Sequence, residues 1–271
     1  MSILREVAVN GIVLGVEDEG QGPALVLLHS GVTDSRMWDP QFGWLASSHR
    51  VVRWDHRGYR DTPHVPGPFS YAADVLAVLD ALGIGKATLI GASMGGMMAI
   101  RVALEHPERI ERLVLVGTNL YGYEPSPVVD VPPYLAAAYE KADKAEDFEA
   151  MMELDLQFWI AGIHRRPSDL DVAFITLSRD MLRSTYQPQN GSEPTDDETS
   201  DVDRIGELTM PVLVVVGEED APTIQRIGRL IAEKAPRAQF TSLANAAHSP
   251  SLEQAERFNE ILAQWLEGTS N

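Results

Sequence analysis

The sequence predicts an α/β fold, in which a mostly parallel central sheet is flanked by helices, and two observations support this prediction. Apolar runs of strand length alternate with stretches of helical periodicity along most of the 271 residues. This alternation is interrupted over residues 120–210, where no run typical of a buried strand occurs. We therefore expect a core formed by residues 1–119 and 211–271, with an all-helical insertion over residues 120–210.

The expected strands begin with a hairpin. Residues 4–18 favour two short strands that turn at Asn10-Gly11, a dipeptide typical of two-residue hairpins, and these strands would form an antiparallel edge. The run PALVLLHS at 23–30 is apolar almost throughout, as in a strand buried on both faces of a parallel sheet. The other expected strands cover residues 50–58, 87–93, 109–119, 211–220 and 238–246.

The expected helices lie between these strands and within the insertion. Those of the core cover residues 71–84, 94–107, 221–235 and 251–268, and those of the insertion cover residues 133–163 and 170–186. Residues 187–201 are polar and acidic and contain proline, which predicts a solvated loop. Because α/β folds bind ligands at loops that follow the carboxyl ends of parallel strands, the insertion is a candidate lid.

Composition excludes several classes of function. The formal net charge of −18 argues against a nucleic-acid partner and against an anionic membrane surface, since both need a basic face. The absence of cysteine excludes disulfides, thiolate nucleophiles and cysteine-based metal sites. The N-terminal residues lack the pattern of a secretion signal, and no apolar run approaches the roughly 18 residues that span a bilayer. We therefore expect a soluble, cytoplasmic protein.

The stretch GASMG at residues 91–95 fits the pattern G-x-S-x-G. It follows a strand-like run and precedes a helix-like run, which is the context of a nucleophile elbow, a sharp turn that lifts a serine hydroxyl above the sheet. A phosphate-binding loop is less consistent, because the stretch has no lysine in the P-loop arrangement and no G-x-G-x-x-G pattern. A plain strand–helix turn is the simpler alternative. We predict that Ser93 is a nucleophile.

A nucleophilic serine requires a general base, and the sequence offers seven histidines. His248 follows the last core strand, at the strand ends where Ser93 also lies, and is therefore the best candidate for the base. We expect His106 to cap a helix and His29 to be a buried core residue. We expect surface positions for His49 and His164. Structural roles remain open for His56 and His64, which follow an expected strand.

The acid that orients the base should end another strand and precede the histidine in the chain. The strand over residues 211–220 ends in Glu218, Glu219 and Asp220, and Asp220 lies farthest along the loop. Asp220 is the predicted acid, with Glu219 and then Glu218 as alternatives. An N-cap of the following helix is the other interpretation of Asp220.

An oxyanion hole requires preorganised N–H donors. The residue after the nucleophile, Met94, supplies one backbone N–H. The loop after the strand at 23–30 should supply the second, and there Gly31 allows the backbone to turn its N–H toward the site.

Together these residues resemble the α/β-hydrolase superfamily, in its cofactor-free serine branch. The resembling pieces are LVLLHSG, RVVRWDHRGYRDT, ATLIGASMGGMMAIRVALEHPERIERLVLVGT, PVLVVVGEED and AAHSPSLEQAERFNEILAQWL. They cover most of the chain outside the insertion, in the order of the superfamily. The resemblance implies a triad of Ser93, His248 and Asp220, an oxyanion hole at Gly31 and Met94, and a helical cap matching residues 120–210. Ser30 departs from the glycine that the family often has before the donor residue, which leaves the backbone path there open.

The predicted function is hydrolysis of a small carboxylic ester or lactone through an acyl-enzyme, without a metal or an organic cofactor. A cofactor-free perhydrolase or haloperoxidase-like enzyme, a carbon–carbon bond hydrolase, and a small-molecule receptor with little turnover are the alternatives. Apolar side chains of the cap would set specificity. Candidates for either the pocket or the core are Met97, Met98, Phe148, Met151, Met152, Phe158 and Trp159.

Overall fold

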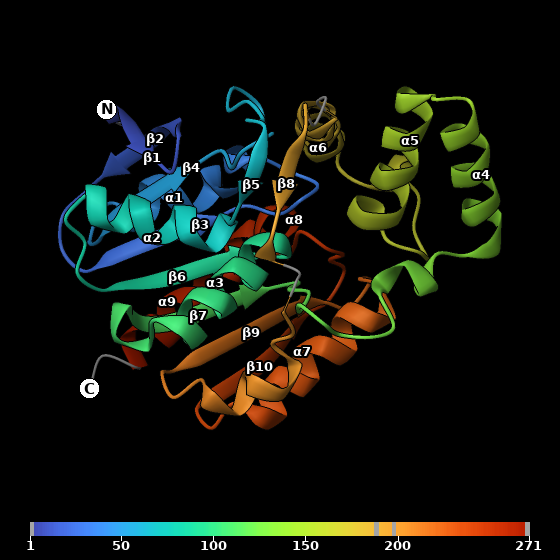
Figure 1. The fold of residues 1–271 in the computed structure, drawn as a ribbon. Coiled ribbons are helices and arrows are strands. Elements are labelled where there is room, and N and C mark those ends of the chain that lie inside the picture. The colour runs from blue at the N-terminus through green and yellow to red at the C-terminus, as the bar shows by residue number, and fades with distance from the viewer. Residues whose placement is uncertain (1–2, 187–189, 197–198, 269–271) are drawn as a thin grey trace.

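An eight-stranded sheet forms the centre of the computed structural model, which describes residues 3–186, 190–196 and 199–268 (Figure 1). The strands lie in the order β1-β2-β4-β3-β6-β7-β9-β10. They are β1 (Ile3–Val9), β2 (Ile12–Glu19), β3 (Ala24–Leu28), β4 (Arg50–Trp54), β6 (Ala87–Ala92), β7 (Ile110–Val116), β9 (Val212–Gly217) and β10 (Ala238–Leu243). From β4 to β10 all neighbours pair in parallel, whereas β1 and β2 are antiparallel, so the predicted α/β fold is confirmed.

The hairpin turns where the sequence predicts. Val9 pairs with Ile12, and the two intervening residues, Asn10 and Gly11, both have positive φ (43° and 79°). Asparagine and glycine adopt this conformation at low cost, which fixes the register of β1 against β2.

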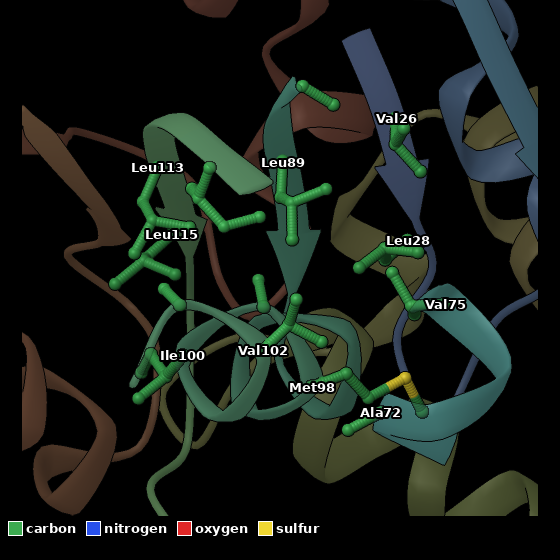
Figure 2. Close-up of a cluster of buried hydrophobic side chains, with 14 of the residues drawn as sticks. Val26, Leu28, Ala72, Val75, Leu89, Met98, Ile100, Val102, Leu113 and Leu115 are labelled. Carbon is green, nitrogen blue, oxygen red and sulfur yellow. The ribbon is translucent and has the colours of Figure 1, made fainter. Parts of the chain in front are cut away.

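Helices cover both faces of the sheet. One layer contains α2 (Tyr71–Ala81), α3 (Met94–Glu105) and α7 (Pro222–Lys234), and the other contains α1 (Asp39–Leu45) and α9 (Ala255–Gly268). Successive strand residues point to opposite faces, so Leu89 packs in the first layer and Ile90 in the second. Figure 2 shows Leu89 facing Met98 and Val102 of α3. Each such buried aliphatic side chain contributes roughly 1.5–3 kcal/mol of transfer free energy.

The segment between β7 and β9 is mainly helical, and Figure 1 shows its helices α4 and α5 beside the sheet rather than over either face. Its helices are η3 (Pro127–Asp130), α4 (Pro133–Lys144), α5 (Phe148–Asp155), the π-helix η4 (Leu156–Ala161), η5 (Pro167–Asp169), α6 (Val172–Thr185) and η7 (Val202–Glu207). The division of the chain into a core and a cap stays a prediction.

One expectation for this segment is wrong, because it is not all-helical. Ser192–Pro194 forms a short strand, β8, which pairs in parallel with β5 (Gly67–Phe69), within the stretch predicted to be a loop. Asp196 follows it and accepts hydrogen bonds from the Ser70 hydroxyl and the Tyr71 N–H, both at 2.8 Å, at the start of α2. The residues in these contacts are more than 120 positions apart in the sequence, so local periodicity could not predict them. Part of the predicted loop, 187–189 and 197–198, lies outside the described residues.

Other differences concern the ends of elements. The strand expected over 50–58 ends at Trp54, and the helix expected over 251–268 is divided into α8 (Pro250–Glu253) and α9. The helices expected over 133–163 are separated at residues 145–147. Short 3-10 helices precede α1, as η1 (Ser35–Trp38), and β7, as η2 (Pro107–Arg109). Among the residues that the structure describes, no helix has both the length and the apolar character needed to cross a membrane.

Candidate active site

Ser93 occupies the sharp turn between β6 and α3, in the strand–turn–helix context that the sequence predicts. Its backbone has φ 48° and ψ −110°, a conformation that costs a non-glycine residue of order 1–3 kcal/mol. The Ser93 N–H donates to the carbonyl of Val116, at the end of β7, at 2.9 Å. A side chain at Gly91 would collide with the backbone of Gly95, and one at Gly95 would collide with the Leu28 carbonyl. Both glycines therefore permit the close approach on which the turn depends.

His248 and Asp220 form a buried hydrogen-bonded pair. The His248 Nδ1 lies 2.9 Å from Asp220 Oδ2 and 3.1 Å from Asp220 Oδ1, and the side chains are 2% and 1% exposed. The N–H of Ala221 also donates to Asp220 Oδ1, at 2.7 Å. In these contacts Asp220 accepts hydrogen bonds and orients the imidazole through its Nδ1. The other ring nitrogen, Nε2, is left to accept a proton.

The end of β7 brings Ser93 and this pair into one neighbourhood. Gly117 follows the Val116 that binds the Ser93 N–H, and a Cβ built on Gly117 would lie 3.0 Å from the His248 carbonyl oxygen and 3.2 Å from Asp220 Oδ2. The three sequence-predicted residues therefore lie near the end of β7, each following the carboxyl end of β6, β9 or β10.

Within the described residues, no hydrogen bond joins either alternative acid to His248. Glu218 is exposed and accepts a hydrogen bond from the Ser242 hydroxyl at 2.8 Å. The Glu219 backbone carbonyl faces Gly162. Asp220 is thus the carboxylate of this strand end that is hydrogen-bonded to His248.

The loop after β3 lies next to the start of α3. A Cβ built on Gly31 would lie 3.8 Å from the Met94 Cβ. The Ser30 hydroxyl accepts from the Val32 N–H at 3.2 Å and lies 3.1 Å from the Thr33 hydroxyl, so the serine that departs from the family pattern binds its own loop. Since α3 begins at Met94, its first N–H groups have no acceptor within the helix.

Tyr59 is a neighbour of this loop that sequence reasoning missed. Its hydroxyl lies 3.4 Å from the Gly31 carbonyl oxygen and 3.5 Å from the Met94 sulfur. Burial raises the pKa of the phenol, so the proton stays on it at neutral pH. Its position in the chain could have indicated this contact, because Tyr59 lies on the loop after β4, at the carboxyl ends of the strands.

Trp159 covers His248 from the segment between β7 and β9. The two ring centroids are 4.6 Å apart. The backbone N–H of His248 donates to the backbone carbonyl of Trp159 at 3.2 Å. The sequence predicted either a pocket or a core position for Trp159. Its place in η4, against the imidazole, gives it a direct contact with the candidate site.

The other histidines have structural surroundings. His29 is fully buried, its Nδ1 lies 2.8 Å from the Ser30 carbonyl, and its Nε2 accepts from the His56 N–H at 3.0 Å, as expected of a satisfied core residue. Burial lowers the pKa of both His29 and His56. His106 caps the end of α3 and His164 is exposed, as expected, whereas His49 is half-buried.

A cavity of about 440 Å³ lies between η3, α4, α5 and η4. Three of the pocket candidates, Met151, Phe158 and Trp159, line it. Met98 and Met152 are core residues, and Phe148 is neither, because it is 65% exposed. Within the described part of the chain, no three histidine or acidic side chains gather as a metal would require.

The comparisons with known proteins identify the fold family of the chain. The model of the alpha/beta hydrolase fold family matches residues 23–255. A pimeloyl-[acyl-carrier protein] methyl ester esterase of Aeromonas hydrophila is 29% identical over 93% of this chain and 99% of its own length. A 2-hydroxymuconate semialdehyde hydrolase of Pseudomonas putida is 29% identical over 97% of this chain and 93% of its own length. The crystal structure of the enol-lactonase from Burkholderia xenovorans LB400 has a TM-score of 0.80 and 27% identity, with 97% of this chain and all of that chain covered.

Proposed function

Since this chain belongs to the α/β-hydrolase fold family, and an esterase and an enol-lactonase are among the members similar to it, we propose that it is a serine hydrolase of small carboxylic esters or lactones. The observation that carries the proposal is the buried hydrogen bond between His248 and Asp220, at the strand ends where Ser93 occupies its turn. An esterase and an enol-lactonase among the similar proteins support the ester or lactone class.

In the proposed first step, His248 accepts the Ser93 hydroxyl proton while the Ser93 oxygen bonds to the substrate carbonyl carbon. The carbonyl electron pair moves to its oxygen, which accepts hydrogen bonds from the Gly31 and Met94 N–H groups. Asp220 orients the imidazole and stabilises its positive charge. The ester C–O bond then breaks, and His248 gives its proton to the leaving alkoxide.

Water completes the cycle. It attacks the acyl carbon while His248 takes one of its protons. The bond between the acyl carbon and the Ser93 oxygen then breaks, and that oxygen recovers the proton from His248. The acid is released, and each group returns to its starting state. No step in this sequence requires a metal or an organic cofactor.

Residues 120–210 act in this proposal as a cap over the site. The contact of Trp159 with the His248 ring supports this role, and so does the cavity that Trp159 also lines. Its volume is within the range of small-molecule pockets. The substrate would therefore be a small molecule whose acyl or alcohol part enters between the helices of the cap.

Replacing Ser93 with alanine tests the proposal. Activity toward a short-chain p-nitrophenyl ester should fall at least a thousandfold, while Ser47→Ala, at an exposed serine after α1, should retain full activity. A fluorophosphonate probe should label the wild-type protein, and peptide mapping should place the label on Ser93. Retained activity in Ser93→Ala, or a label on another residue, would contradict the proposal.

A second candidate is hydrolysis of a carbon–carbon bond by the same residues. The relative from Pseudomonas putida favours it, because its name specifies a semialdehyde rather than an ester or lactone. Comparing a vinylogous diketone with esters of similar size separates the two reactions. Ser93-dependent cleavage of the diketone with no ester turnover would favour the second candidate.

A further inference from the structure

The cap cavity and the candidate base share one wall. Trp159 lines the cavity and contacts the ring of His248. The rest of the wall is mostly apolar, with Val128, Val131, Ala136, Met151 and Phe158. A group of the substrate that extends from His248 past Trp159 would enter a largely apolar space, which favours a hydrocarbon part.

Apart from the indole N–H of Trp159, the polar side chains of the wall are acceptors or donate to one another. Asp155 accepts the Tyr139 hydroxyl on Oδ1 at 2.8 Å and the Tyr186 hydroxyl on Oδ2 at 2.6 Å. Both phenol protons are thus used by a carboxylate and are not directed at a ligand. Tyr139 also lines the cavity, so its hydroxyl proton is held by Asp155 and is not offered to a ligand there.

Two more carboxylates, Glu140 and Asp143, line the cavity from the exposed side of α4. Among the described residues that line it, none is arginine, lysine or histidine. Two basic side chains of neighbouring elements are already paired, since Lys144 lies 2.5 Å from Glu140 and Arg226 lies 3.7 Å from Asp130 of η3.

We propose that the cap cavity selects esters whose far end is apolar and uncharged or cationic, and rejects esters with a terminal carboxylate. This inference rests on the proposed function and specifies its substrate class. A carboxylate in the cavity would lose water without gaining a cation from the lining residues, and it would meet Asp143, Asp155 and the ion-paired Glu140. The net charge of −18 adds a long-range repulsion of the same sign.

Three p-nitrophenyl esters of equal acyl length test the selection: the hexanoate, the adipate monoester, which ends in a carboxylate, and the 6-trimethylammoniohexanoate. Each kcat/KM is divided by the spontaneous hydrolysis rate of the same ester. At low ionic strength the adipate monoester should be at least fivefold poorer than the hexanoate, and the cationic ester should equal or exceed it. Salt at 0.5 M should narrow the gap, because the charges that repel the carboxylate are partly exposed.

A pair of matched variants locates the effect. Glu140→Gln/Asp143→Asn should raise the ratio of adipate to hexanoate turnover at least twofold. The control Glu108→Gln/Asp203→Asn removes the same charge from exposed residues of η2 and η7, which precede β7 and β9 and so lie toward the opposite strand ends. It should leave the ratio unchanged. Equal turnover of adipate monoester and hexanoate at low salt, or equal ratios in the two variants, would overturn the inference.

Binding measured without hydrolysis keeps this inference separate from the proposed function. Calorimetric titration with hexyltrimethylammonium and with hexanoate should show tighter binding of the cation. Tighter or equal binding of hexanoate would overturn the selection even if Ser93-dependent ester turnover is intact. Absence of that turnover would contradict the proposed function, and the order of the two affinities would still decide the selection.

Discussion

The indole ring of Trp159 lies 4.6 Å from the imidazole ring of His248, and the backbones of the two residues share a hydrogen bond of 3.2 Å. One residue comes from a π-helix between β7 and β9 and the other from the loop after β10. This contact joins the helical segment to the candidate base, so one side chain of that segment lies against the His248 ring.

Replacing Trp159 with alanine should lower kcat/KM for a p-nitrophenyl ester about tenfold. The indole restricts the imidazole and keeps water from one side of it, whereas the backbone hydrogen bond to His248 survives the change. Trp44→Ala removes an indole that is 39% exposed on α1 and should leave kcat/KM unchanged. Equal losses in the two variants would show that the ring contact with His248 has no part in activity.

Replacing Asp220 with asparagine should lower kcat about 10³–10⁴-fold, because an amide cannot hold the imidazole in the required tautomer or stabilise its charge. Glu219→Gln, at the neighbouring carboxylate of the same strand end, should change kcat less than threefold. The experiment measures steady-state hydrolysis in both variants, after circular dichroism has shown that each is folded. A larger loss in Glu219→Gln than in Asp220→Asn would reassign the acid.

Replacing Gly95 with alanine should lower the free energy of unfolding by about 3 kcal/mol or more, or prevent folding, because the new methyl group would collide with the backbone carbonyls of Leu28 and His29. Gly43→Ala provides the contrast, since this glycine lies within α1 with open space where the Cβ would stand. It should raise the free energy of unfolding by about 0.5–1 kcal/mol. Urea denaturation of both variants checks the prediction, and equal effects of the two substitutions would contradict it.

Stability should fall as the pH drops below about 6.5. Burial holds the pKa of His56 well below its ordinary value and also lowers that of His29, so the unfolded chain binds more protons than the folded one in this range. Each histidine contributes a loss of up to about 1.4 kcal/mol per pH unit between its unfolded and its folded pKa.

The variant His56→Phe should reduce that slope. An aromatic ring fits among Trp54, Tyr59 and Tyr71, whose rings lie 5.8–6.4 Å from that of His56, and it carries no proton. His164→Gln, at an exposed histidine, controls for the loss of an imidazole. Urea denaturation at pH 7.5, 6.5 and 5.5 gives the slopes, and an unchanged slope in His56→Phe would refute this account of acid sensitivity.

Much of the fold could be predicted from local sequence because its signals are local. Asn10-Gly11 sets the hairpin turn through the positive φ of these two residues, and the pattern G-x-S-x-G marks the elbow around Ser93. The glycines of the elbow are needed because other backbone atoms approach them closely. Apolar runs such as 211–217 mark strands buried on both faces, since every position of β9 is buried. Chain order then predicted that Ser93, Asp220 and His248 follow strands of one sheet.

Contacts between distant segments decided the rest. Residues far apart in the chain are joined by the pairing of β8 with β5, by the approach of Tyr59 to Gly31 and Met94, and by the contact between the Trp159 and His248 rings. Periodicity reports which face of an element is buried, but it does not report what that face is buried against. The sequence by itself therefore determined the sheet and the candidate triad, whereas the tertiary structure alone decided the shape and the charge of the cavity beside them.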